Sequence, residues 1–478
     1  MTKRVIWWIR RDLRLTDNVA LHAALTSAAQ VIPVFILDDR LLAAPRLRGP
    51  RTAWMLDGLR VLDSDLRAGG ARLIVRRGDP AEALIRLCRE TGAGEVYFNR
   101  DYGPFATRRD DTVSRVLREA GYAVHTFKDL IVHEVHEIAT KGGKPYEVYT
   151  PFFRAWDALP KPAPMPAPDR IERLAAPPDL ASVPIPTAAD LGAEPAPQPI
   201  ALPGEAEALR RLNAFITGPV DNYQDSRNRL DIDGTSILSP YLRWGMISPR
   251  TCYQAAIEAL ARAADERARA GIGHWIKELA WREFNYYVLT NNPHIVSRSF
   301  RAVYDGLAWE DDPAWLQAWK DGQTGYPVVD AAMRQLRATG WMHNRARMIT
   351  ASFLCKDLLI DWRQGEAYFM ERLIDGDVAS NVGGWQWTAG TGTDAAPYFR
   401  IFNPVKQSEQ HDPSGTYIRR WLPELAHVPE GYIHAPHRMP HDVQMRSGCL
   451  IGRDYPAPIV DHDVQRERAL ALYGAVRN

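Results

Sequence analysis

The sequence predicts an α/β doubly wound parallel-sheet domain at the N-terminus, followed by an all-α domain at the C-terminus. Three observations lead to this prediction: short β-rich runs alternate with helical patterns at the start, prolines gather after them, and helical patterns dominate the rest. A chain of 478 residues is also too long for one ordinary hydrophobic core. We therefore expect domains at 1–130 and 205–478, joined by a linker at 131–204.

The N-terminal sheet is expected to contain five strands. The β-rich runs are residues 5–9, 31–37, 72–77, 95–100 and 123–127. Helical patterns lie between them, for example over 52–70 and 80–93. Strands that alternate with helices form a parallel sheet covered on both faces. No GxGxxG or P-loop pattern follows the first strand, so the sequence supports neither common nucleotide site.

The linker is recognised by its proline content. Residues 160–203 contain thirteen of the 35 prolines, and this composition favours extended polyproline segments over a packed element. The preceding residues 141–156, KGGKPYEVYTPFFRAW, fit either a domain junction or a β-turn and strand.

Composition excludes several classes of protein. The net charge is only +1 at pH 7, so any contact with nucleic acid must come from a local basic patch. Four widely spaced cysteines form no CxxC pair, which predicts neither disulfides nor a metal site. The start, MTKRVIWWIRRDLRL, is interrupted by charges, and no apolar run reaches 18 residues. We expect a cytoplasmic protein without membrane segments or a signal peptide.

Two stretches of the helical half carry candidate chemistry. Residues 235–239, TSILS, precede a helix start, so their hydroxyls either bind a phosphate or cap the helix. Residues 274–288, HWIKELAWREFNYYV, predict a helix in which Glu278 and Arg282 could form an ordinary i, i+4 pair.

The segment 341–404 mixes tryptophans, arginines and aspartates. Residues 342–359 predict a helix that places Asn344, Arg347 and Met348 near one face, either as a site or as a polar surface stripe. Residues 375–377, DGD, predict a turn first, and they lack the ligand spacing of an EF-hand.

The motifs WMHNRARM, LIDGDVASNVGGWQW and TGTDAAPYFRIFNP resemble the flavin-binding half of the DNA photolyase/cryptochrome family. The match is close to bacterial class I-type cyclobutane pyrimidine dimer photolyases, and RRDLRLTDN resembles the N-terminal signature of the family. The resemblance implies a monomer that binds ultraviolet-damaged DNA and FAD in its C-terminal domain. Excited reduced FAD would donate an electron to the dimer, the cyclobutane ring would split, and the electron would return. A cryptochrome-type blue-light receptor is the alternative, and the short C-terminus argues against it.

The resemblance also implies roles for individual residues. Contacts with FAD fall on Tyr223, Thr235, Ser236, Leu238, Ser239, Trp275, Asn344, Arg347, Asp375, Asp377 and Asn381, with Arg347 paired to Asp375. Catalytic roles fall on Glu278, Asn344, Met348 and Asn381. Contacts with DNA fall on Arg227, Glu278, Trp281, Arg282, Arg345, Trp387 and Arg400. Trp309, Trp362 and Trp385 match the electron relay of the family, although each could be only a packed aromatic residue.

The resemblance further implies a light-harvesting antenna chromophore in the α/β domain. Residues 99–110 align with the antenna loop of the family. Gly103 stands where folate-binding relatives carry glutamate, which weakens methenyltetrahydrofolate. Asp101 stands where deazaflavin-binding relatives carry an acid, which allows 8-hydroxy-deazaflavin. An empty pocket is the third alternative.

Overall fold

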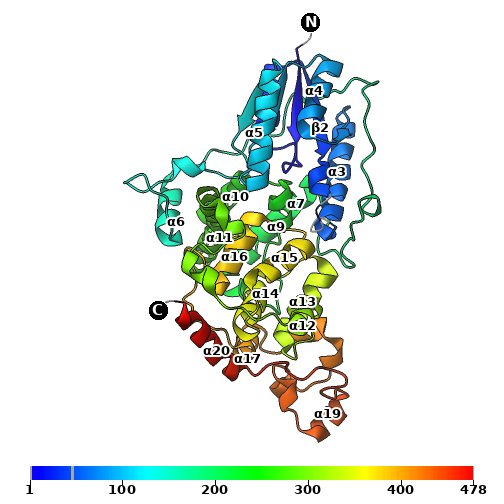
Figure 1. Ribbon diagram of the computed structural model, residues 1–478. Coiled ribbons are helices and arrows are strands. Elements are labelled where there is room, and N and C mark those ends of the chain that lie inside the picture. The colour runs from blue at the N-terminus through cyan, green and yellow to red at the C-terminus, as the bar shows by residue number, and fades with distance from the viewer. Residues whose placement is uncertain (1–2, 43, 45–47, 477–478) are drawn as a thin grey trace.

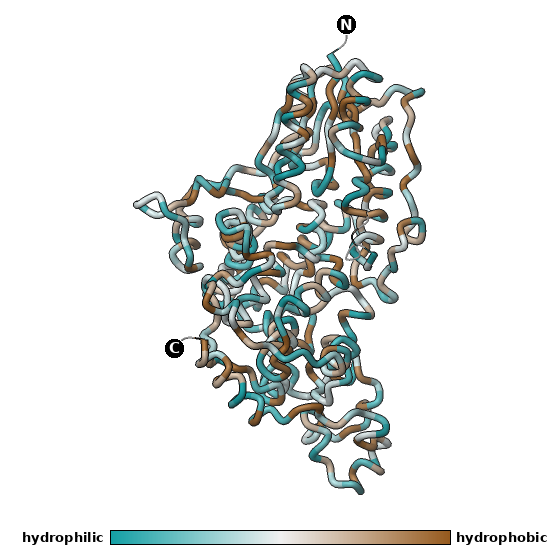
Figure 2. Tube along the Cα trace, in the orientation of Figure 1, coloured by the Kyte–Doolittle hydropathy of each residue, from teal (hydrophilic) through white to brown (hydrophobic). Residues whose placement is uncertain are grey.

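The computed structural model describes residues 3–42, 44 and 48–476. An α/β part formed by the N-terminal residues packs against one end of a larger helical part (Figure 1). The molecule is elongated in the direction that joins the two parts. Hydrophobic residues are concentrated in the central strands and on the inner sides of the helices (Figure 2).

The N-terminal sheet has five parallel strands. They are β1 (Arg4–Ile9), β2 (Gln30–Leu37), β3 (Ile74–Arg77), β4 (Glu95–Asn99) and β5 (Ala123–Phe127), in the order β3-β2-β1-β4-β5. The chain therefore crosses over on both sides of β1, which is the doubly wound arrangement. The predicted fold class is confirmed, and all five strands lie where their β-rich runs predicted them.

Helices cover both faces of this sheet. Along β1, Trp7 packs into the cluster that includes α1 (Val19–Ser27) and α3 (Pro50–Ala68). The next residue, Trp8, packs on the other face with α4 (Pro80–Thr91) and α5 (Pro104–Glu119). Alternating side chains of a strand point to opposite faces, so a strand buried on both faces must be apolar throughout, as RVIWWI nearly is.

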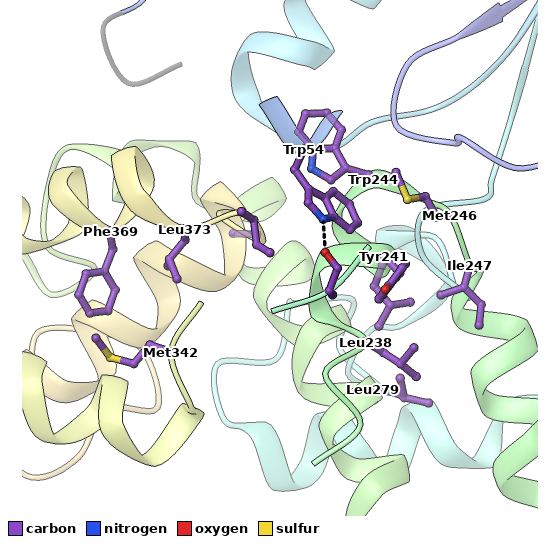
Figure 3. Packing of buried hydrophobic residues seen from close by; sticks show 14 of the residues in the cluster. Trp54, Leu238, Tyr241, Trp244, Met246, Ile247, Leu279, Met342, Phe369 and Leu373 are labelled. Carbon is purple, nitrogen blue, oxygen red and sulfur yellow. Dashed lines mark hydrogen bonds between the residues drawn. The ribbon is translucent and has the colours of Figure 1, made fainter. Parts of the chain in front are cut away.

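The hydrophobic core continues from the α/β part into the helical part without a break. Trp54 of α3 makes an edge-to-face contact with Tyr241 of α9 (Ser239–Trp244), with ring centroids 5.4 Å apart (Figure 3). The indole of Trp54 also donates a hydrogen bond to the carbonyl oxygen of Ala201, at 3.2 Å. These contacts fix the α/β part against the helix that borders the candidate site.

A buried cluster of charges also joins the two parts. The carboxylate of Asp129 accepts from Arg14 and from Arg250 of α10 (Pro249–Arg262), each at 2.7 Å. Burial alone would raise the pKa of Asp129, but the two guanidinium groups outweigh it and hold that pKa below its ordinary value. Paired in this way, the charges avoid most of the cost of burial.

The proline-rich linker runs along the outside of the α/β part (Figure 1). It is mostly irregular, with two short 3-10 helices, η3 (Ile171–Arg173) and η4 (Ala189–Leu191). Backbone hydrogen bonds attach it to the sheet edge, for example from Val183 to Val75 at 3.0 Å. Before it, the interpretation of residues 141–156 as a strand is wrong. α6 (Tyr149–Ala158) forms because Phe152 and Trp156, one turn apart, are both buried.

The helical part contains the remaining elements. The helices of at least eight residues are α7 (Glu205–Ile216), α10, α11 (Glu266–Asn291), α12 (Pro313–Asp321), α13 (Pro327–Thr339), α14 (Asn344–Ser352), α15 (Trp362–Arg372), α16 (Val378–Ala389), α17 (Pro404–His411) and α20 (His462–Ala475). None of the helices in the described ranges combines the length and the apolar character that a membrane span requires.

One predicted helix is interrupted. The single helix expected over 342–359 is instead α14 followed by a π-helical turn, η8 (Phe353–Asp357). The wider turn holds two buried polar side chains against partners from distant segments. Lys356 donates to the carbonyl oxygen of Ala389 at 3.0 Å, and Asp357 contacts His462 at 2.5 Å.

Candidate active site

A cavity of about 510 Å³ lies in the helical part, bounded mainly by α9, α11, α14 and α16. It brings together most of the residues singled out from the sequence. These are Tyr223, Arg227, Ser236, Leu238, Ser239, Trp275, Glu278, Trp281, Arg282, Asn344, Arg347, Met348, Asp375, Asp377, Asn381, Trp385 and Trp387. Thr235, Trp309, Arg345, Trp362 and Arg400 are not part of its lining.

Asp375 is the anchor of one wall. Its Oδ2 accepts hydrogen bonds from Ser239 Oγ at 2.6 Å and from Arg347 Nη2 at 2.7 Å, so the predicted Arg347–Asp375 pair is confirmed. Arg347 also donates to the carbonyl oxygen of Met342, at 2.8 Å. The other oxygen of Asp375 is buried and has no hydrogen-bond partner among the described residues. A buried acceptor of this kind needs a donor, and the cavity is where that donor could lie.

Asp377 fixes α16 and connects the cavity to the α/β part. Its Oδ1 accepts from the backbone of Ala379 at 3.1 Å and caps the helix. Its Oδ2 accepts from Arg11 at 2.6 Å and from the Tyr286 hydroxyl at 2.5 Å. Burial would raise the pKa of Asp377, but Arg11 and Arg243 outweigh it and hold that pKa far below its ordinary value.

Arg11 is a site residue that the sequence alone did not reveal. Its guanidinium bridges Asp377 and Asp101, which is 3.1 Å away at the carboxyl end of β4. RRDLRLTDN was recognised as a signature, but no role followed for its second arginine. The structure shows that this arginine ties the predicted antenna loop to α16. The carboxylate of Asp101 is thus already paired with Arg11. The identity of the antenna chromophore stays a prediction.

The cavity wall suits a molecule with hydroxyls and phosphates, as FAD has. Besides the unpaired oxygen of Asp375, it carries Arg243 Nη1, a buried donor without a partner among the described residues. Burial, with Arg11 nearby, lowers the pKa of Arg243 to about 10, so this arginine stays charged at neutral pH. Gly384 on α16 faces open space, because a Cβ added there would meet no atom within 4 Å. An acceptor, a cation and an unobstructed wall fit FAD.

Asn381 is held by a partner that the sequence analysis did not identify. Its Nδ2 donates to the backbone carbonyl of Glu366 at 3.0 Å and to the carboxylate of the same residue at 2.9 Å. With the nitrogen assigned in this way, the amide is fixed at the cavity wall. Its predicted place beside the flavin ring stays a prediction.

The ionic partner of Glu278 is not the arginine one turn further along its helix. Glu278 pairs with Arg227, so the interpretation of Glu278 and Arg282 as an i, i+4 pair is wrong. Arg282 instead donates to the carbonyl oxygen of Leu130 at 2.8 Å, and its predicted contact with DNA stays a prediction. Burial raises the pKa of Glu278, and Arg227 opposes that rise.

Aromatic and amide groups surround Glu278. Trp281 stacks on Tyr149 of α6 with ring centroids 3.7 Å apart and an angle of 10°. No sequence pattern singled out Tyr149, which lies on α6, far from Trp281 in the chain. On α14, Asn344 Nδ2 lies 3.8 Å from Met348 Sδ, so the two predicted site residues do share one face.

Three arginines share the rim of the cavity. Arg345 donates to the Asn228 side chain at 2.7 Å. Burial, followed by repulsion from Arg227 and Arg400, lowers the pKa of Arg345 to about 10. Arg345 is therefore close to both of the other predicted phosphate ligands, and the three arginines form a local basic patch on a chain of almost zero net charge.

Of the three relay tryptophans, Trp309 alone is partly exposed. Trp385 and Trp362 are buried, at 2% and 1% exposure, whereas Trp309 is partly exposed. The ring of Trp385 lies against Gly365, where an added Cβ would meet its Cη2 at 2.1 Å. Gly365 lies one turn after Trp362 on α15, so the Trp385 ring from α16 packs beside the turn that follows Trp362. The order suits a path from the surface to the cavity.

Known proteins match nearly the whole chain. Residues 5–169 match the family described as DNA photolyase, and residues 275–475 match the FAD binding domain of DNA photolyase. A deoxyribodipyrimidine photo-lyase from Halobacterium salinarum is 46% identical over 99% of this chain and 99% of its own length.

Two solved structures extend this comparison. A class III photolyase from Agrobacterium tumefaciens has a TM-score of 0.92 and 41% identity, and the match covers 100% of this chain and 98% of the other. A cryptochrome from Synechocystis has a TM-score of 0.90 and 30% identity, with 99% of each chain covered.

Proposed function

The chain belongs to the DNA photolyase family, and we propose that it uses the cavity described above for the light-dependent repair of cyclobutane pyrimidine dimers in DNA. The observation that supports this most directly is the joint lining of one cavity. Asp375 and Arg347 can hold the flavin there, while Glu278 and Trp281 can hold the lesion. The blue-light receptor alternative is less supported, because the cryptochrome is 30% identical and the repair enzyme from Halobacterium salinarum 46%. Assignment to a class I-type enzyme stays a prediction, since a class III photolyase is 41% identical.

FAD, when bound, supplies the electron that light drives onto the dimer and takes it back after the ring opens. The chain's own residues hold and orient it. Asp375 offers a free carboxylate oxygen to a hydroxyl, and Arg243 offers a free N–H group to a phosphate. Arg347 lies beside Asp375, and Asn381 presents its fixed amide at the wall. Ser236, Leu238 and Ser239 line the cavity near the start of α9.

The dimer would be held by the groups around Glu278. A damaged pair of bases stacks poorly, so it is less costly to extrude than an intact pair. Trp281 and Trp387 line the cavity and can replace the lost stacking while they exclude water. Asn344 and Met348 supply an amide and a thioether on the facing helix. Arg227, Arg345 and Arg400 are the proposed ligands of the backbone phosphates.

The proposal extends to a second chromophore, to oligomeric state and to location. The candidates for the antenna are 8-hydroxy-deazaflavin and methenyltetrahydrofolate, bound by the α/β part. We propose a monomer in the cytoplasm, and four buried free cysteines agree with a reducing compartment.

Repair is tested directly with an oligonucleotide that contains one thymine dimer. The purified protein with chemically reduced FAD is expected to restore the absorbance of undamaged thymine under blue light, and not in darkness. An oligonucleotide without the dimer serves as the control. If the dimer persists under saturating light although reduced FAD is bound, the proposed function is wrong.

The proposed relay predicts a separation of two activities. A Trp362→Phe variant is expected to lose light-driven reduction of the bound oxidised cofactor by an added thiol, because the middle step of the path is missing. Repair by chemically reduced protein should be unchanged, since that reaction does not use the path. Flavin absorbance measures the first activity, and dimer loss measures the second. Trp421→Phe, which changes a tryptophan outside the cavity, should affect neither. Equal photoreduction in both variants would contradict the relay.

A further inference from the structure

A second cavity, of about 540 Å³, lies between the start of α17 and the start of α20. Its wall includes Arg400, Lys406 and Arg466, with His462 and Asp463 between them. Figure 1 shows α17 and α20 next to each other in the part of the helical region away from the sheet, with α19 (His441–Ser447) farther out. None of the proposed roles uses Lys406 or Arg466.

The three cations of this wall are exposed and unpaired. Within the described part of the chain, no carboxylate lies within ion-pair distance of Arg400, Lys406 or Arg466. The next arginine of α20, Arg468, is paired, because it contacts Glu310 in the segment before α12. A chain with 59 basic and 58 acidic residues has enough carboxylates to pair them, so three free cations around one hollow are a local excess of positive charge.

The two other titratable groups of the wall do not cancel this excess. Asp463 supplies one negative charge. The Nδ1 of His462 is committed to the buried carboxylate of Asp357, at 2.5 Å. That contact positions the imidazole as a fixed part of the wall. Three cations against one exposed carboxylate leave the hollow positive.

A short segment of the chain connects the linings of the two cavities. Residues 392–395 line the first cavity, and Arg400, five residues further on, lines the second. Arg400 also lies close enough to Arg345 at the rim of the first cavity to repel its charge. Arg400 therefore links the positive charge beside the first cavity to the cations of the second.

We propose that the second cavity binds backbone phosphates of the DNA strand that flanks the lesion, with Lys406 and Arg466 as ligands. This inference rests on the proposed function, because the lesion fixes where the strand enters. Each further nucleotide brings one phosphate, and a strand leaving the rim toward Arg400 meets the cavity next. Lysine acts there as a point charge and arginine as a planar fork. Such contacts add affinity without reading sequence.

The test uses the FAD-loaded protein and duplexes that carry one thymine dimer. Binding of Lys406→Ala/Arg466→Ala is compared with wild type over a range of salt concentrations. We expect weaker binding of a long duplex and a salt slope smaller by about two, roughly one per lost phosphate contact. Arg86→Ala/Arg118→Ala removes the same charge from exposed positions on α4 and α5 and should leave affinity and slope unchanged.

Shortened duplexes locate the contact. Truncation on one side of the dimer should weaken wild-type binding and abolish the difference between wild type and Lys406→Ala/Arg466→Ala. Flavin absorbance and the unfolding temperature should match wild type in all variants. The proposal is overturned if the long duplex binds both proteins equally, or if the difference survives whichever side of the dimer is truncated. It is also overturned if inorganic phosphate alone stabilises wild type while flank length has no effect. Wild-type repair of the shortest duplex tests the proposed function separately.

Discussion

An Asp375→Ala variant is expected to be purified without bound flavin, although it folds. The carboxylate accepts hydrogen bonds from Ser239 and Arg347, and its second oxygen is free for the cofactor. The change removes an acceptor from the cavity and leaves the Arg347 guanidinium without its anion. Hydrogen bonds to charged groups contribute about 1.5–3 kcal/mol each, so we expect FAD affinity to fall roughly a hundredfold or more.

Titration of the apoprotein with FAD, followed by flavin fluorescence, measures this effect. The ratio of flavin to protein absorbance after purification gives a second reading. Glu371→Gln is the matched control, because it removes a carboxylate from the same region of the chain without touching the cavity. Circular dichroism should show the same helix content in both variants. Unchanged FAD affinity in Asp375→Ala would mean that the cofactor is held elsewhere.

Local patterns were sufficient for the sheet and for the helices α3, α4 and α11. Every strand was predicted because its residues are β-branched or aromatic and its neighbours are helical, and both properties can be read within ten positions. The Arg347–Asp375 pair followed from resemblance, not from spacing. The π-helical turn was missed, because its cause is a pair of contacts between Asp357 and His462 and between Lys356 and Ala389, far apart in sequence.

The groups that organise the site come from distant segments. Arg11 reaches Asp377 across 366 positions, and no local pattern of either residue announces the other. Glu278 had a partner available one turn away in Arg282, yet it pairs with Arg227, 51 positions distant. For Asp377 burial decides, because a buried carboxylate requires the cation that the fold places beside it. Glu278 is partly buried, and the fold places Arg227 within ion-pair distance of it. Tertiary structure, and not helix spacing, therefore selects the ion pairs of this cavity.

A Glu278→Ala variant is expected to bind FAD normally and to repair dimers several times more slowly. Glu278 lies in the cavity with Trp281, where the resemblance places a hydrogen bond to the dimer. Such a bond stabilises the negative charge that develops when the dimer takes up an electron. A net hydrogen bond contributes about 1 kcal/mol, which corresponds to roughly fivefold in rate. Glu266→Ala, on the exposed first turn of the same helix, should repair at the wild-type rate.

The pH dependence of repair distinguishes a hydrogen bond donated by Glu278 from a mere packing role. Burial raises the pKa of Glu278, whereas Arg227 and, to a smaller extent, His274 lower it. The hydroxyls of Tyr149 and Tyr223 lie near enough for the charge of Glu278 to affect them. If a DNA phosphate draws Arg227 away, the largest opposing charge is lost and the pKa rises further. Below this raised pKa the carboxyl group is protonated and can donate to a carbonyl oxygen of the dimer. Wild-type repair should therefore fall as pH increases through this raised pKa. Glu278→Gln, whose amide donates at every pH, should show no such fall, and a parallel decline in both proteins would exclude a role for the Glu278 proton.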